Sequence, residues 1–68
     1  MLNIVEIDYT SWRGIRRVRK IHPLHLIFSK NEWHTEMQWM LEATDIETGE
    51  SRCFAMKNIH SWKPSSAD

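Results

Sequence analysis

Five cationic side chains are concentrated between positions 13 and 20 of this 68-residue chain. They are Arg13, Arg16, Arg17, Arg19 and Lys20. A guanidinium group donates two parallel hydrogen bonds to a phosphate, so closely spaced arginines are suited to bind anions. In an extended strand, Arg17 and Arg19 share one face, while Arg16 and Lys20 share the other. The run predicts either an anion-binding surface or a solvated face that pairs with the acids of the second half.

Two tryptophans and a further arginine extend this prediction. Trp12 stands beside the basic run, and Trp33 lies in an otherwise polar stretch. Aromatic rings stack on nucleic-acid bases, at about 1–3 kcal/mol per base. Trp33 has two other readings, an anchor of a protein interface or a ring that folds back to close one end of the fold. Arg52 either contacts an anion or pairs across strands with Glu42 or Asp45. The predicted nucleic-acid or ligand-binding residues are Arg13, Arg16, Arg17, Arg19, Lys20, Arg52, Trp12 and Trp33.

The formal net charge of the whole chain is zero, but its two halves carry opposite net charges. Residues 1–30 hold six Lys or Arg and two acids, a net +4, whereas residues 31–68 hold three and seven, a net −4. This layout admits an anionic partner at one surface, and equally admits pairing between the two halves. A net charge of zero supplies no long-range attraction to nucleic acid.

Metal and catalytic chemistry find little support. Zinc ligands could come from His22, His25, His34, His60 and Cys53, but no paired-cysteine motif is present. In a regular strand, His22 and His25 point to opposite faces. No glycine-rich phosphate loop, nucleophile elbow or His-Glu-x-x-His motif occurs. We expect no metal, no cofactor and no catalytic residue, with the four histidines at the surface.

The length allows one domain with a small core, since such a chain buries only about 60% of its unfolded surface. Cys53 is the single cysteine. A lone thiol suits a reducing interior, and we expect it to be structural and half-buried. The start lacks the basic and apolar regions of a signal peptide, and no run approaches the ~18 apolar residues of a membrane span. We therefore expect a cytoplasmic protein without membrane contact.

The clearest strand pattern covers residues 38–45. Trp39, Leu41 and Ala43 alternate with polar residues, as in a strand with one buried face. These three side chains are expected in the core. Met40 interrupts the pattern, because it falls on the face expected to meet water.

Further strands are predicted over 3–10, 15–29 and 51–56. In the first, Val5, Ile7 and Tyr9 share the inner face. Proline cannot donate to a ladder, so Pro23 should mark a bulge at which the long second strand bends. Beyond it, the side chains expected in the core are Leu24, Leu26 and Phe28.

Turns separate these strands, at 11–14 and at 47–50, each with a glycine. Residues 57–62 form either a helical turn or a last short strand. The expected fold is all-β, either a compact barrel of about five strands or a strongly twisted sheet. The barrel is expected over 1–62, followed by a flexible tail over 63–68.

The order of these motifs resembles the WYL domain over roughly residues 3–60. The segments that carry the resemblance are Tyr9, Arg17-Val18, Ile21-His22-Pro23-Leu24 with Leu26, Trp39-Met40-Leu41-Glu42-Ala43, and Arg52-Cys53-Phe54-Ala55-Met56 with Ile59. The resemblance implies an Sm-like, SH3-type barrel that binds nucleic acid or nucleotide-type ligands through basic residues on its face. Members of the family usually stand beside a helix-turn-helix domain in bacterial transcription regulators or defence proteins.

The chain departs from the family pattern in three places. Met40 stands where the family has its tyrosine, and Ala55 stands where the second arginine of Arg-x-Phe-Arg would be. Lys57-Asn58 replaces the usual Asp-Arg ending, whereas Arg52 is kept. These 68 residues contain no helix-turn-helix.

Two functions are compatible with these observations. The first is a non-enzymatic WYL-like module that contacts nucleic acid or a nucleotide and acts in regulation. The second is a protein–protein interaction or homo-oligomerisation module, a small accessory protein of phage or prophage origin. It would use Trp12, Trp33, Met40 and a sheet edge. Steep weakening with salt would indicate the first function.

Overall fold

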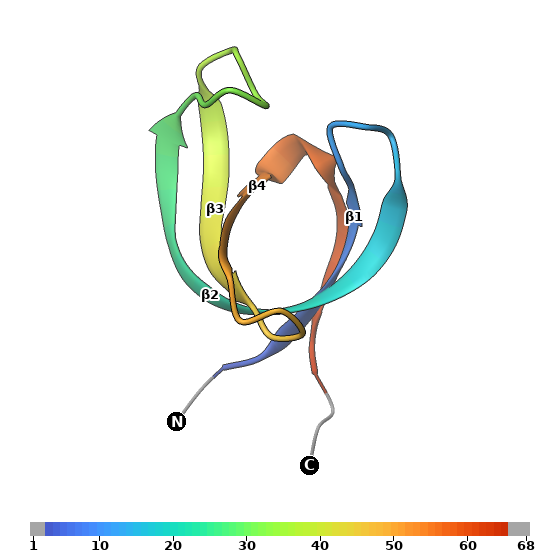
Figure 1. Cartoon of the computed structure of the whole chain (residues 1–68). Coiled ribbons are helices and arrows are strands. Elements are labelled where there is room, and N and C mark those ends of the chain that lie inside the picture. Colours follow the sequence, from blue (N-terminus) through green and yellow to red (C-terminus); the bar gives the residue numbers. More distant parts are fainter. Residues whose placement is uncertain (1–2, 66–68) are drawn as a thin grey trace.

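The computed structural model describes residues 3–65, and within them the chain forms one five-stranded antiparallel sheet (Figure 1). The strands are β1 (Val5–Thr10), β2 (Arg16–Ser29), β3 (Gln38–Asp45), β4 (Ser51–Ala55) and β5 (Ile59–Pro64), with a 3₁₀ turn, η1 (Met56–Asn58), before β5. Their order across the sheet is β4-β3-β2-β1-β5. The all-β class and the five strands are confirmed.

The sheet curls around one concave face, but it does not close into a barrel. β2 is long and curves beneath the other strands from one side of the molecule to the other (Figure 1). β4 and β5 are the two edges of the sheet, and no ladder joins them within the described residues. The sheet is therefore open and curled, and it does not close into the expected barrel. The chain passes from one edge to the other through η1, whose helical turn takes the place of a closing ladder.

The core lies on the concave face. It consists of Val5, Ile7, Tyr9, Ile21, Leu41, Ala43 and Phe54. Tyr9 and Phe54 meet edge to face with ring centroids 4.9 Å apart, and the Ala55 N–H donates to the Tyr9 hydroxyl at 3.3 Å. The inward positions predicted for β1, together with Leu41 and Ala43 of β3, are confirmed.

Two predictions for β3 are wrong. Met40 is buried, with 1% of its surface exposed, whereas Trp39 is 57% exposed. The Met40 sulfur lies 4.0 Å from Asn31 Nδ2, so the β2–β3 loop covers the face that was expected to be wet. Trp39 lies near the start of β3, beyond the core cluster. The alternation of apolar and polar residues assigns side chains to the two faces of a strand, but it does not show that the β2–β3 loop covers one of these faces.

The far half of β2 is also more exposed than predicted. A bulge between Pro23 and His25 is present, as expected. β1 pairs with β2 only as far as Ile21, so the later residues of β2 have a partner strand on one side only. The side chains expected in the core but found about half exposed are Leu24, Leu26 and Phe28.

The bulge changes the expected placement of two histidines. His22 pairs with Thr44, and His25 pairs with Glu42. Thr44 and Glu42 are two residues apart on β3, so both histidines lie on the same face rather than on opposite faces. His25 Nε2 approaches Glu42 Oε1 at 2.7 Å.

The turns lie where glycine was expected to allow them. Gly14 and Gly49 have φ of 81° and 76°, a region that side-chain-bearing residues rarely adopt. Both alternatives for residues 57–62 contribute, because η1 is followed directly by β5. Lys63 and Pro64, expected in a flexible tail, belong to β5. The rest of that expected tail, 66–68, lies outside the described residues. Within the described part of the chain, no helix has the length and apolar character needed to cross a membrane.

Candidate functional site: a basic pocket on the concave face

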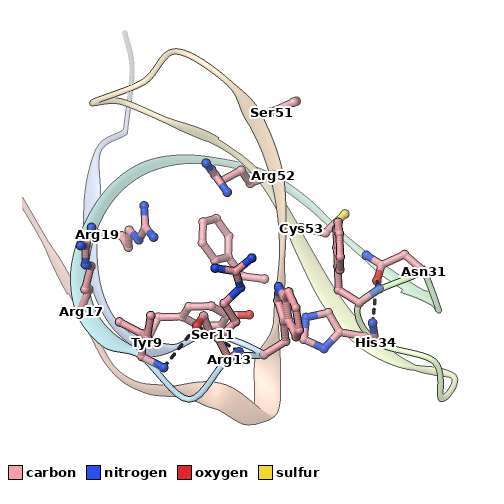
Figure 2. Close-up of a pocket in the computed structure, with 14 residues that line it drawn as sticks. Tyr9, Ser11, Arg13, Arg17, Arg19, Asn31, His34, Ser51, Arg52 and Cys53 are labelled. Atoms are coloured by element: carbon pink, nitrogen blue, oxygen red, sulfur yellow. Dashed lines mark hydrogen bonds between the residues drawn. The ribbon is translucent and has the colours of Figure 1, made fainter.

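A pocket of about 600 Å³ opens on the concave face of the sheet (Figure 2). Its lining residues are Tyr9, Ser11, Trp12, Arg13, Ile15, Arg17, Arg19, Asn31, Trp33, His34, Ser51, Arg52, Cys53 and Phe54. Four of them are arginines and none is acidic. The lining comes from the turn after β1, the first half of β2, the β2–β3 loop and β4.

Strand register directs the arginines into this pocket. Tyr9 is the pairing partner of Arg17, and Ile7 is that of Arg19. Directly opposite residues of antiparallel strands place their side chains on the same face, so these arginines share the face of the core residues. Arg52 lies opposite Ala43 and reaches the same face from β4. Figure 2 shows Arg19 and Arg52 extending toward each other, with Arg17 on the same side of the pocket as Arg19.

One buried carboxylate lies against two of the arginines. Asp45 Oδ2 accepts from Arg19 Nη1 at 3.1 Å and lies 3.7 Å from Arg52 Nε. The Asp45 side chain is 1% exposed. Arg52 also approaches Glu50 Oε1 at 3.3 Å. Arg52 therefore has the Asp45 partner that was one of its two expected roles, and it also lines the pocket.

The other two pocket arginines keep more of their donor capacity. Within residues 3–65, neither Arg13 nor Arg17 forms an ion pair. The Arg13 guanidinium lies 5.1 Å from the centroid of the Trp12 ring, at cation–π distance. These two side chains offer the least neutralised positive charge in the pocket.

A pair of stacked tryptophans forms one wall. Trp12 and Trp33 have ring centroids 5.1 Å apart and an interplanar angle of 15°. They are 52% and 53% exposed, and their stack joins the β2–β3 loop to the turn after β1. Asn31 Oδ1 accepts the backbone N–H of Trp33 at 2.9 Å and that of His34 at 2.8 Å, which fixes the loop. The result is an accessible aromatic surface beside the arginines.

His34 and Cys53 also line the pocket, and the pKa of each side chain is shifted. His34 is nearly buried, which contradicts its expected surface position, and burial beside the Lys57 charge lowers its pKa. Cys53 is half-buried, as expected. Burial and the adjacent Glu42 raise the pKa of its thiol, which disfavours the nucleophilic thiolate. In the described part of the chain, no three His, Cys, Asp or Glu side chains converge to hold a metal ion.

Two of the predicted binding residues lie away from the pocket. Arg16 donates from Nε and Nη2 to the two Asp8 oxygens at 2.9 and 2.8 Å, on the convex side. Lys20 is the pairing partner of Glu6. The predicted residues that the fold brings together are Arg13, Arg17, Arg19, Arg52, Trp12 and Trp33.

Several lining residues were not among the predicted binding residues. Tyr9 and Phe54 were assigned to the core, and they also form the pocket floor. Asn31 could have been found from its loop position, because Asn accepts hydrogen bonds from the backbone two or three residues on. Asp45 was considered only as a partner for Arg52, although an Asp just before a turn commonly caps it.

The fold and the pocket together define a small single-sheet β domain with a basic concave face. The model of the WYL domain family matches residues 2–64, nearly the whole chain, and the protein belongs to this family. WYL domains are generally regulatory domains that sense ligands or nucleic acid, and are not catalytic. No curated protein is similar enough in sequence to be matched with it. The two substituted family positions, Met40 and Ala55, are both buried and outside the pocket lining.

Proposed function

We propose that this WYL domain binds the phosphate groups of a nucleotide or of single-stranded nucleic acid in its concave pocket, without catalysis. The observation that carries the proposal is the convergence of four arginines and a tryptophan pair in one hollow with no acidic lining. Guanidinium groups match phosphate oxygens, and an exposed aromatic face accepts a base of any sequence. The same domain would report the bound ligand in a regulatory role.

The four arginines have unequal parts in this proposal. Arg13 and Arg17 supply the primary phosphate contacts, because no carboxylate within the described residues competes for them. Arg19 and Arg52 share Asp45, so each offers only the donors that Asp45 leaves free. Trp12 and Trp33 provide the stacking surface for a base, next to Arg13.

The size of the pocket supports a nucleotide-sized ligand or a short stretch of a single strand. Its volume of about 600 Å³ falls within the ~300–1,000 Å³ typical of small-molecule sites. The chain has no net charge, so attraction to a polyanion must come from the pocket itself rather than from the overall field.

A titration at two salt concentrations tests the proposal. Labelled single-stranded DNA and RNA oligonucleotides, and a mononucleotide, are titrated with the protein at 50 and 200 mM salt. With three or four phosphate contacts, the affinity for a single strand should fall about 20- to 50-fold between these concentrations. Absence of binding of all three ligands at 50 mM salt would contradict the proposal.

A pair of neighbouring arginines provides matched variants. Arg17→Ala removes a pocket arginine, and Arg16→Ala removes its neighbour on the same strand, which is held by Asp8 outside the pocket. We expect Arg17→Ala to weaken binding at least tenfold and to reduce the salt dependence by about one contact. Arg16→Ala should bind as the wild type does. Equal losses in the two variants would indicate a diffuse charge effect instead of a pocket.

The alternative, an interaction module that uses Trp12, Trp33 and Met40, loses one of its anchors. Met40 is covered by the β2–β3 loop and cannot contact a partner. The two tryptophans remain exposed, but they lie beside the arginines of the pocket. This arrangement favours ligand binding over a protein interface at that surface.

A further inference from the structure

One stretch of β2 has an open backbone edge. β2 pairs with β1 from Arg16 to Ile21 and with β3 from Ile21 to Ser29. Within residues 3–65, no strand pairs with 24–29 on the side that β1 has left. Successive residues of a strand direct their hydrogen-bonding groups to opposite sides, so about half of these six lack a ladder partner there. Figure 1 shows this end of β2 as the outer margin of the curled sheet.

This edge has fewer protective features than the other two edges, although the bulge between Pro23 and His25 lies at its start. β5 carries Lys63 and Pro64 near its end, and β4 is only five residues long and carries Arg52. Lysine, proline and short length are the usual means by which edge strands avoid pairing with other chains. Residues 24–29, Leu-His-Leu-Ile-Phe-Ser, contain no Lys, Arg, Asp, Glu or Pro.

Three of the four apolar residues of this stretch, Leu24, Leu26 and Phe28, are arranged symmetrically about Leu26, whereas Ile27 would lie opposite His25. If the segment pairs antiparallel with a copy of itself around Leu26, then Leu26 faces Leu26 and Leu24 faces Phe28. These three side chains are each about half exposed in the single chain. Because the segment holds no Lys, Arg, Asp or Glu, self-pairing opposes no like formal charges across the strands. This pairing of apolar side chains follows from the sequence of the segment itself, whereas a partner with a different sequence need not provide it.

We propose that two copies of this chain associate by antiparallel pairing of residues 24–29, with the twofold axis at Leu26. The two sheets then continue across the axis as one, and apolar side chains of both copies meet beside it. None of residues 24–29 lines the basic pocket, so both pockets remain open in the dimer. The proposal is independent of the ligand proposed above.

The proposed contact buries a small area, so we expect the two copies to associate weakly. A pair of six-residue strands contributes less surface than the roughly 1,200–2,000 Å² of a stable interface. The dimer should therefore be reversible, with half-association on the order of 10–100 μM.

Sedimentation of the full chain between about 5 and 500 μM tests this association. The wild type should pass from monomer to dimer over that range. Leu26→Lys places two positive charges opposite each other on the twofold axis and should remain monomeric. The matched control is Val18→Lys, because Val18 is 61% exposed on the half of β2 that pairs with β1, outside residues 24–29. A monomeric wild type at 500 μM, or a Leu26→Lys variant that dimerises as the wild type does, would overturn the proposal.

A cross-link tests the position of the axis and does not depend on the lysine variant folding. Leu26→Cys is made in a Cys53→Ser background, so that the only thiol lies on the proposed axis. Opposed residues of antiparallel strands have Cα atoms about 4.5–5.5 Å apart, within reach of a disulfide. Mild oxidation should yield a disulfide dimer that grows with protein concentration, whereas Val18→Cys in the same background should not. Equal cross-linking at both positions, or none at Leu26→Cys, would place the contact elsewhere and refute the assignment.

Discussion

The carboxylate of Asp45 accepts a hydrogen bond from Arg19 Nη1 at 3.1 Å through Oδ2, while Oδ1 accepts the Glu47 backbone N–H at 2.9 Å. The side chain is buried, so both contacts are shielded from water. One residue thus joins a pocket arginine to the turn between β3 and β4. It also adds a negative charge directly behind the anion-binding surface.

The substitution Asp45→Asn separates these two roles. The amide oxygen can still accept from the turn, but the negative charge against Arg19 and Arg52 is lost. We expect phosphate affinity to rise about three- to tenfold, by about 0.7–1.4 kcal/mol, because Arg19 loses its carboxylate partner and Arg52 keeps only Glu50. The free energy of unfolding should fall by about 1–3 kcal/mol, since both arginines lose a buried partner. Mononucleotide titration and urea denaturation measure the two effects, and an unchanged or weaker affinity would contradict the first.

Trp33→Ala tests the aromatic wall. Removal of one ring of the stacked pair should weaken single-strand binding by about 1–3 kcal/mol, or roughly 5- to 150-fold. The effect on stability should be small, because the ring is half exposed. Trp62→Ala is the control, since Trp62 is similarly exposed on β5 and does not line the pocket. Binding isotherms of both variants decide the question, and equal losses would argue against a stacking role.

Tyr9→Phe should change the response of the domain to alkaline pH. Burial raises the pKa of the Tyr9 phenol, so the folded state favours its neutral form. The corresponding stability is complete below the ordinary phenol pKa of about 10 and is lost as pH rises through the raised folded value. The variant lacks this loss, so the stability difference between the two proteins should shrink above pH 10. Urea denaturation from pH 7 to 11 follows the difference, and parallel curves would be inconsistent with this reasoning.

At neutral pH, the same variant reports on one buried hydrogen bond. Phenylalanine leaves the Ala55 N–H without its acceptor, the Tyr9 hydroxyl. We expect a loss of about 1–3 kcal/mol in the free energy of unfolding. A neutral effect would mean that the N–H finds another acceptor.

His34→Gln should reduce sensitivity to mild acid. Burial beside Lys57 lowers the pKa of His34 in the folded state. The stability linked to its neutral form is present above the ordinary pKa of about 6.5 and is lost as pH falls through the lowered folded value. The wild type should therefore lose stability between pH 7 and 5 relative to the variant. Denaturation at these pH values measures the difference, and an identical slope for both proteins would exclude His34 as its source.

Local alternation was sufficient to predict most of the fold. It located the first four strands and the inward face of β1, whereas residues 57–62 stayed open between a helical turn and a strand, and the bulge at Pro23 followed from the missing proline N–H. It also placed Arg17 and Arg19 together and apart from Arg16, because the two-residue period of a strand does not depend on tertiary contacts. The pairing of Tyr9 with Arg17 then brings that face to the pocket.

Features that depend on distant segments could not be predicted in this way. Met40 is buried because the preceding β2–β3 loop folds over it, and Leu26 is exposed because β1 ends its pairing with β2 at Ile21. The stack of Trp12 on Trp33 joins two separate loops, so neither local sequence contains it. Closure of the sheet depends on whether the two edge strands meet, which strand patterns leave undetermined.

The bulge between Pro23 and His25 changes which residue positions of β2 face the concave side of the sheet. Before it, odd-numbered positions such as Arg17 and Arg19 face the hollow, whereas after it the even-numbered Leu26 lies opposite the core residue Leu41. One inserted residue thus lets a single strand present charge at one end and an apolar surface at the other. Deletion of the extra residue, Leu24, would restore a regular ladder and leave His25 to Ser29 on their present faces, whereas loss of the bulge with Leu24 retained would exchange those faces.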